Sequence, residues 1–503
     1  MMKLRSRRAA AAVGAGVLAG HAAHAQVIDA TWIDDTSGIW SDAARWSSPD
    51  FPTARGPDIY RAIIDFDSGG AYTISLGAAI DLDQLVFTSA DATIDGGGVG
   101  SLVIRTDVEL GDATIRSLDE LMIEGTLRFD GSVLCDIEDT PGCQTDGTAR
   151  KTGTGDIAFS GTTRFEFAQG TSFTIENTGD IIGDTTARLV NGGTFIKQSP
   201  GTTLIEDVGF VNTGTVVVEQ GRLEITNPIL PSAGTLGPAT YDIFDTAVLD
   251  LSGTPLDTNQ ADVIFRGPDS AFPQFSAVET NQGLARAEGG ADISFSPTSG
   301  LANEGVLEAD GAGSTITATG SLNNTGQVTV LNGGVIRSTL VENNLGVVEG
   351  NGSIETASFT NNGLVSPGNS PGVLVTENPL GTHVFQQGVD GTLLIEIEGR
   401  TAGVDHDVLD VRGIALFDGV LQLEFSPFSG EPPVQPGDQF QIILADGIDG
   451  QFRDIQLSGL GVEGQVDVFL NPGGVLVVVR EIPAPGALAL IAMGGVIAGR
   501  RRR

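Results

Sequence analysis

Lysine is nearly absent from this sequence. Only three of the 503 residues are lysines, namely Lys3, Lys151 and Lys197. Lysine and arginine together number 27 against 64 Asp and Glu, which gives a formal net charge of −37. A surface so poor in cations repels phosphate backbones. The composition therefore argues against nucleic acid as a partner.

Cysteine, histidine and aromatic residues are also scarce. The chain has two cysteines, four histidines and 6% aromatic residues. It contains no H-E-x-x-H, no G-x-S-x-G, no G-x-x-x-x-G-K-[ST] and no His/Cys cluster with zinc spacing. We therefore expect a protein that is not an enzyme and carries no cofactor. Its many carboxylates leave Ca²⁺ binding and polysaccharide cleavage open as alternatives.

Residues 1–25 have the pattern of a secretory signal peptide. Basic residues come first, an apolar run of small residues follows, and the segment ends in Ala23-His24-Ala25. This order of basic, apolar and A-x-A segments is typical of signal peptides that are removed after export. We predict a secreted protein.

Residues 481–503 form a second addressing segment. A proline-containing motif precedes a short apolar run over 486–499, and a block of arginines follows. This arrangement resembles the PEP-CTERM sorting signal, with Pro-Ala-Pro where that family has Pro-Glu-Pro. The residues concerned are Pro483, Ala484, Pro485, Arg500, Arg501, Arg502 and Arg503.

The resemblance implies export in a bacterium with an extracellular polysaccharide matrix. It also implies processing by an exosortase-type enzyme and transient membrane insertion through the tail. The predicted location is the cell envelope, outer surface or extracellular matrix. A plain C-terminal anchor is the alternative, so cleavage or retention of the tail stays open.

The chain between these segments reads as strands separated by turn residues. Apolar and polar residues alternate over 121–129, 215–225 and 334–341, and 70 residues are glycine. An Asn-x-Gly phrase recurs before many of these runs. It begins at Asn177, Asn191, Asn212, Asn303, Asn324, Asn344 and Asn361.

The spacing of this phrase predicts an all-β fold, a parallel β-helix or solenoid. Gly305, Gly326, Gly346 and Gly363 follow one another at steps near 20 residues, about one circuit of a solenoid. We expect about 15 coils stacked ~4.8 Å apart. Asn and Gly suit the corners because both tolerate positive φ, and stacked Asn side chains can hydrogen-bond along the axis. Two antiparallel β-sandwiches with Asn-Gly hairpins are the alternative.

Three stretches resemble proteins with autotransporter-like, passenger-type β-helix repeats. They are the Trp-rich segment 31–49, the phrase at 361–377 with its two Ser-Pro-Gly triplets, and the β-rich stretch 391–425. The resemblance implies three structural parts for the body. These are an N-terminal cap over 26–75, solenoid repeats over 76–380 and a C-terminal β-rich module over 381–480.

All three tryptophans, Trp32, Trp40 and Trp46, lie in the Trp-rich segment. Indole faces stack on sugar rings, so these residues are candidates for glycan contact. Alternatively, they close the open end of the solenoid, because terminal repeats need a cap. Cys135 and Cys143 flank a Pro-Gly turn, and in an oxidising compartment we predict a disulfide between them.

Asp405, Asp407 and Asp410 are the best candidates for Ca²⁺ ligands, since they place carboxylates close together in an acidic chain. A simple turn is the alternative, because Asp407 and Asp410 would face opposite ways in a strand.

The sequence as a whole favours an exported, non-catalytic structural or adhesin-like protein at the cell surface or in the matrix. A polysaccharide-cleaving enzyme (a lyase or glycoside hydrolase) on the same coil and a glycan-binding module are the alternatives.

Overall fold

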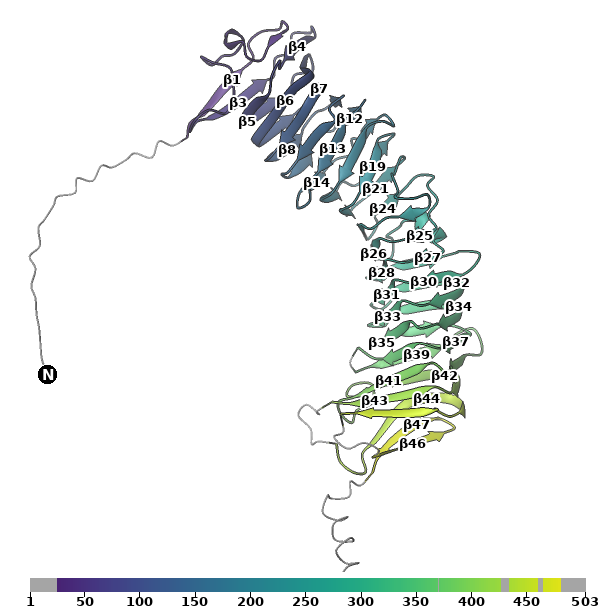
Figure 1. The fold of residues 1–503 in the computed structure, drawn as a ribbon. Helices are drawn as coiled ribbons and strands as arrows, with labels where there is room; N and C mark the ends of the chain where they lie inside the picture. Colours follow the sequence, from purple (N-terminus) through teal and green to yellow (C-terminus); the bar gives the residue numbers. More distant parts are fainter. Residues whose placement is uncertain (1–24, 370, 427–433, 460–464, 481–503) are drawn as a thin grey trace, which may run out of the picture.

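The computed structural model describes residues 25–369, 371–426, 434–459 and 465–480. It is nearly all β, with 58% strand and 2% helix, and its stacked parallel strands form a solenoid of about 15 turns. The coils make one curved rod, from β1 (Val27–Thr31) at one end to β47 (Gly474–Val479) at the other (Figure 1). The predicted parallel β-helix is confirmed, and the alternative of two β-sandwiches is wrong.

Each coil consists of three strands, which build three walls of the rod. Along most of the rod, a strand pairs in parallel with the strand one coil earlier on the same wall. We call the walls the first, second and third, in chain order. In two successive coils, the first wall contains β12 (Asp156–Ser160) and β15 (Ile181–Gly183). The second wall contains β13 (Arg164–Phe167) and β16 (Arg188–Asn191). The third wall contains β14 (Ser172–Ile175) and β17 (Thr194–Lys197).

Alternating side chains decide which face of each strand lies inside. In β13, Phe165 and Phe167 are buried, whereas Arg164 and Glu166 point outward and pair with each other. Because successive side chains point to opposite faces of a strand, this alternation fills the coil interior with apolar groups. The period-two pattern of the sequence is thus the pattern of the core.

A row of asparagines runs through the interior at the end of the second wall. Each Nδ2 donates to the side-chain carbonyl of the next member, at 2.7–2.9 Å, and all the members are buried. The predicted stacking of asparagines along the axis is confirmed. The members of this asparagine ladder are Asn259, Asn281, Asn303, Asn324, Asn343, Asn361 and finally Gln387.

Glycines follow the ladder because successive coils approach closely there. A Cβ at Gly305 would lie 2.1 Å from the carbonyl oxygen of Gly283, and one at Gly326 would lie 2.2 Å from that of Gly305. Neither Gly305 nor Gly326 has a positive φ. Tolerance of positive φ, the reason predicted for glycine at the corners, therefore does not apply to these two glycines. They are required for space rather than for conformation.

The solenoid begins earlier than residue 76. Strand β1 pairs in parallel with β3 (Ile59–Ile64), and β3 pairs in parallel with β5 (Ile80–Phe87). The Trp-rich segment is a loop inserted between β1 and β3, and it contains β2 (Gly38–Ile39) and a short 3-10 helix. The predicted cap is therefore part of the first coil.

The solenoid also continues beyond residue 380. On the third wall β41 (Thr392–Ile397), β43 (Val420–Phe425) and β45 (Asp454–Ser458) remain parallel and in register. The C-terminal β-rich stretch 381–480 therefore begins as a continuation of the solenoid, because its strands up to β45 extend the existing ladders.

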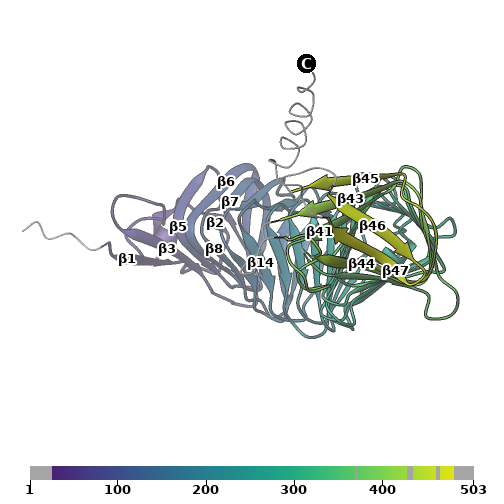
Figure 2. The same cartoon turned by 90° about the horizontal axis from the view of Figure 1, so that it is seen from below.

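Antiparallel strands close the C-terminal end of the rod. Strand β47 pairs with β44 (Gln439–Gly450) and with β46 (Val466–Asn471), in both cases antiparallel. Figure 2 shows these strands crossing the end of the rod. The signal peptide, apart from Ala25, and the sorting tail lie outside the described residues. Within the described residues, no helix is long and apolar enough to cross a membrane.

Candidate functional sites

The three tryptophans form a compact cluster over the first coil. Trp32 and Trp40 are fully buried and Trp46 is 3% exposed. The ring of Trp46 lies 5.2 Å from that of Trp32 and 4.9 Å from that of Trp40, between centroids. Trp46 Nε1 donates to the carbonyl oxygen of Trp40 at 2.8 Å, and Trp40 Nε1 donates to that of Pro52 at 3.0 Å.

This packing makes the cluster a cap. A glycan platform needs exposed indole faces, and these faces are covered by one another and by the first coil. The assignment of Trp32, Trp40 and Trp46 as glycan contacts is therefore wrong for this structure. The indoles instead shield the first layer of the core from water.

Cys135 and Cys143 are buried free thiols. Cys135 lies in β9 (Leu134–Glu138) on the first wall and Cys143 in β10 (Gly142–Thr145) on the second wall of the same coil. The predicted disulfide is not present in the structure, in which both thiols are free and buried in the core of one coil. Burial raises the pKa of both thiols well above the ordinary value, which keeps them protonated and unreactive.

The three aspartates proposed as Ca²⁺ ligands have different partners. Asp405 accepts from the backbone N–H of Thr401 at 2.9 Å, and Asp410 pairs with Arg412 at 3.2 Å. Asp407 is fully buried, and burial raises its pKa to about 7. Among the described residues, no group of three or more His, Cys, Asp or Glu side chains is placed to hold a metal ion. The proposed ligand set is not assembled.

Asp407 instead forms hydrogen bonds to the backbone of two separate segments. Its Oδ1 accepts from the N–H of Gly372 and its Oδ2 from the N–H of Glu396, both at 2.9 Å. The carboxylate therefore bridges the Ser-Pro-Gly phrase and strand β41. Its role in this structure is to satisfy buried donors.

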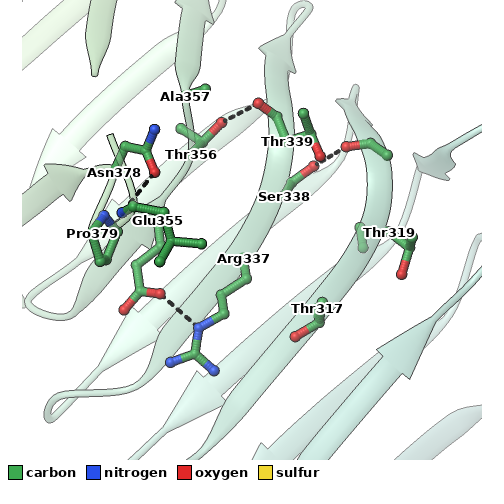
Figure 3. A pocket seen from close by; sticks show the side chains of 13 residues that line it. Thr317, Thr319, Arg337, Ser338, Thr339, Glu355, Thr356, Ala357, Asn378 and Pro379 are labelled. Atoms are coloured by element: carbon green, nitrogen blue, oxygen red, sulfur yellow. Dashed lines mark hydrogen bonds and ion pairs between the residues drawn. The ribbon is translucent and has the colours of Figure 1, made fainter. Parts of the chain in front are cut away.

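A groove runs along the corner between the first and second walls (Figure 3). It has a volume of about 620 Å³ and is lined by residues of four successive coils. On one side the loop after β39 (Val373–Glu377) projects, and Leu380 at its tip is 97% exposed. In the neighbouring coils the chain turns this corner in short connections, at Gly320, Thr339 and Ala357. The loop after β39 is longer and projects beyond these connections, and the groove lies beside it.

The groove is lined by hydroxyl groups, one ion pair and the apolar side chains of Ala318, Ala357, Pro379 and Leu380. Arg337 Nε lies 2.6 Å from Glu355 Oε2, and Thr317 lies beside Arg337, whereas Thr319 and Thr339 lie farther from this pair (Figure 3). Glu355 is the one carboxylate among the lining residues. Glycoside hydrolysis uses two carboxylates, so this groove lacks the pair needed for that reaction. Its hydroxyls suit contact with a polar chain.

The corner beneath the groove is fastened by polar side chains. The Ser338 hydroxyl donates to the carbonyl oxygen of Gly320, and the Thr356 hydroxyl donates to that of Thr339. His383 Nδ1 lies 2.7 Å from the carbonyl oxygen of Thr356. These buried groups hold the corner rigid. Sequence reasoning missed the groove because it depends on the difference in length between adjacent loops.

The outer surface has almost no unpaired cation. Between residues 25 and 480, every arginine except Arg188 lies within 4 Å of a carboxylate in the described structure. Arg188 donates to the backbone carbonyls of Thr185 and Ala187. The unpaired carboxylates therefore give the rod an acidic exterior.

Comparisons with known proteins add no family or relative. No protein-family model, curated protein or solved structure matches this chain.

Proposed function

We propose that this protein is exported, sorted to the cell envelope and used there as a structural or adhesin-like rod. The observation that carries the proposal is the parallel ladder of the third wall, which runs without a break from β1 to β45. The rod that it builds is closed by the tryptophan cap at one end and by antiparallel strands at the other. Closed ends prevent endless stacking of copies, so each chain is one rod of defined length.

The rod would act by display. About 15 coils at ~4.8 Å per coil give a length on the order of 70 Å, measured along the axis. The acidic exterior keeps copies apart and attracts divalent cations. Contacts with other surface components would be spread along the walls and add up as in other multivalent systems.

The sorting tail can be tested by deletion. Removing residues 481–503 is expected to release the protein into the medium, because the apolar run and its arginines are lost. A matched variant that replaces only Pro483, Ala484 and Pro485 by Gly-Ser-Gly keeps the apolar run. If an exosortase-type enzyme processes the tail, this variant stays longer than the mature protein by mass. Unchanged envelope retention after deletion would contradict the sorting proposal.

The display role can be tested by removing one coil in register. Residues 304–324 make up one coil, because Asn303 and Asn324 occupy equivalent ladder positions. Their deletion is expected to preserve folding and cell adhesion, with Asn303 bonded to Asn343. A control that deletes residues 304–314 removes half a coil and places strands on the wrong wall. Adhesion that survives loss of the whole protein would contradict the proposal.

Glycan binding in the groove is the second candidate. The hydroxyl-lined groove favours it, since such a surface can hydrogen-bond a polysaccharide chain. We expect the purified protein to bind on a glycan array and Thr319→Ala with Thr339→Ala to weaken the binding at least several-fold. Thr174→Ala, on an outward position of the third wall, is the control. Equal loss in the control would refute a role for the groove.

A further inference from the structure

The two lysines of the described chain lie inside the solenoid. Lys151 ends β11 (Ala149–Lys151) and Lys197 ends β17, both on the third wall, and both are 0% exposed. Ile175 separates them in register, so the two sites are two coils apart at the same corner. A buried ammonium is costly unless oxygen atoms surround it.

The two amines have different partners. Lys197 Nζ donates to four oxygens, namely the carbonyl and hydroxyl of Ser199 and the carbonyls of Gly201 and Gln220. Lys151 Nζ donates to the carbonyl of Gly153 at 3.3 Å and to Asn177 Oδ1 at 2.8 Å. Of the two lysines, Lys151 alone faces a side-chain amide.

The amide of Asn177 is unusual in its surroundings. Its Nδ2 is buried and has no hydrogen-bond partner. Its Oδ1 also accepts from the backbone N–H of Gly179, at 3.3 Å. A Cβ at Gly179 would lie 2.2 Å from Lys151 Nζ, so glycine leaves the space that the amine occupies. The site thus holds an amine against an amide whose oxygen is polarised and whose nitrogen is unbonded.

We propose that Lys151 and Asn177 form an intramolecular isopeptide cross-link. The Nζ lone pair attacks Cγ of Asn177, and negative charge develops on Oδ1 beside the Gly179 N–H. The Cγ–Nδ2 bond then breaks, a proton from Nζ passes to Nδ2, and ammonia leaves. One C–N bond replaces another, so the reaction needs no oxidant or reductant.

The surroundings favour this step. Burial lowers the pKa of Lys151 to about 8, so the neutral, nucleophilic amine is more populated than for an exposed lysine. The charges of Asp156 and Asp180 act on the pKa of the same amine in the opposite direction. The product is a neutral amide between adjacent coils. It removes both the buried charge and the unbonded amide nitrogen.

A tryptic digest of the denatured full-length protein tests the cross-link. Trypsin cuts after Lys151, Arg164 and Arg188 when the lysine is free, which gives peptides 152–164 and 165–188. Modification of Lys151 blocks the first cut. The expected product is therefore peptide 151–164 joined to 165–188, at about 17 Da below the sum of the two masses, because one ammonia is lost.

Matched variants locate the bond. Lys197→Met is expected to leave the joined peptide unchanged, whereas Asn177→Ala is expected to give the separate peptides 152–164 and 165–188. Loss of ammonia by cyclisation of an asparagine elsewhere leaves these peptides separate and does not mimic the result. If wild-type protein held at about pH 9 gives only the separate peptides, the proposal is overturned, whatever the variants do.

Discussion

The coils over residues 149–225 and those over 258–387 follow the same three-walled path but fill it differently. The first region packs phenylalanine rings in a continuous file, with centroids 4.7 Å apart for Phe167 and Phe173 and 5.3 Å apart for Phe173 and Phe195. The second region contains the asparagine ladder. Backbone pairing thus sets the path, and either apolar volume or a chain of buried amides can complete the interior.

The boundary between the regions shows why the ladder does not run the whole length. Leu236 is in register with Asn259, so an apolar side chain occupies the ladder position of that coil. On the other side of this break, Asn191 Nδ2 donates to Asn212 Oδ1 at 2.8 Å, but Asn212 Nδ2 is buried without a partner. An interrupted ladder leaves an unsatisfied donor at its end.

Among the substitutions that test this comparison, one in the file of phenylalanine rings is expected to have the largest effect on stability. Phe173 is 1% exposed and contacts the rings of Phe129, Phe167 and Phe195. Phe173→Ala is expected to lower the free energy of unfolding by about 3–5 kcal/mol, because it leaves a cavity that the rigid walls cannot close. Urea denaturation checks the value. A loss below about 1 kcal/mol would show that the file does not stabilise its region.

The ladder is next. Asn303→Ala removes the acceptor of Asn281 and the donor to Asn324, and both remaining groups are buried. We expect a loss of about 2–4 kcal/mol in the free energy of unfolding, since two buried polar groups lose partners. Asn212→Ala is the control, because its Nδ2 has no partner to lose, and about 1 kcal/mol is expected. Equal losses would mean that continuity of the ladder adds nothing.

Two buried titratable groups, Lys197 and Asp407, are expected to make the free energy of unfolding depend on pH with opposite signs. Burial lowers the pKa of Lys197 to about 8, against 10.5 for a free lysine, so the unfolded chain binds more protons between these values. Stability therefore rises with pH over this window, by at most about 1.4 kcal/mol per pH unit. Lys197→Met is expected to lower that slope in denaturation measured from pH 8 to 10.5, while any contribution of Lys151, whose pKa burial also lowers to about 8, remains. A slope in the variant equal to that of the wild type would assign it to another group.

Asp407, in the coils that follow the second region, has the reverse dependence. Its pKa is raised to about 7 from 3.8, so the folded chain binds more protons between these values. The contribution of Asp407 to stability is full below about pH 4 and is lost as pH rises toward 7. The difference in stability between wild type and Asp407→Asn is expected to change with pH over this window. A constant difference would contradict the raised pKa.

The smallest effect on stability is expected from ion pairs on the outer surface of the rod, where the two regions are alike. Arg150 pairs with Glu176 in the first region and Arg337 pairs with Glu355 in the second, and the arginines are 54% and 46% exposed. Arg150→Ala and Arg337→Ala are each expected to cost about 0–1 kcal/mol of stability, because water screens exposed ion pairs. Thermal unfolding of both variants checks this. A large loss of stability in only one of the two variants would show that the regions also differ in how their surface ion pairs contribute.

The repeating features of the fold could be predicted from the sequence. The period-two runs and the Asn-x-Gly spacing predicted the coils, and Asn303, Asn324 and Asn361 were placed correctly in the ladder. The phrase at Asn344 was out by one residue, since Asn343 is the ladder member. Asn259 was missed because no glycine follows it two residues later.

The unpredicted features depend on which residues the coils bring together. The division at residue 380 is wrong because composition does not show whether the next strand pairs in parallel with the last. The cysteines were paired by closeness in sequence, and the structure contains them as free thiols on adjacent walls of one coil. The contact of Lys151 with Asn177 joins positions 26 residues apart, and only the register of the coils reveals it.

The asparagine ladder also gives the rod an electrical direction. Every amide in it points the same way, because each Nδ2 also donates to a backbone carbonyl of a later coil, as Asn281 does to Val306 at 3.1 Å. The amide dipoles therefore add along the axis, with their positive ends toward the C-terminal end, as peptide dipoles add in a helix. A single amide cannot turn over without breaking bonds on both sides, so the polarity of the whole file is fixed when the chain folds.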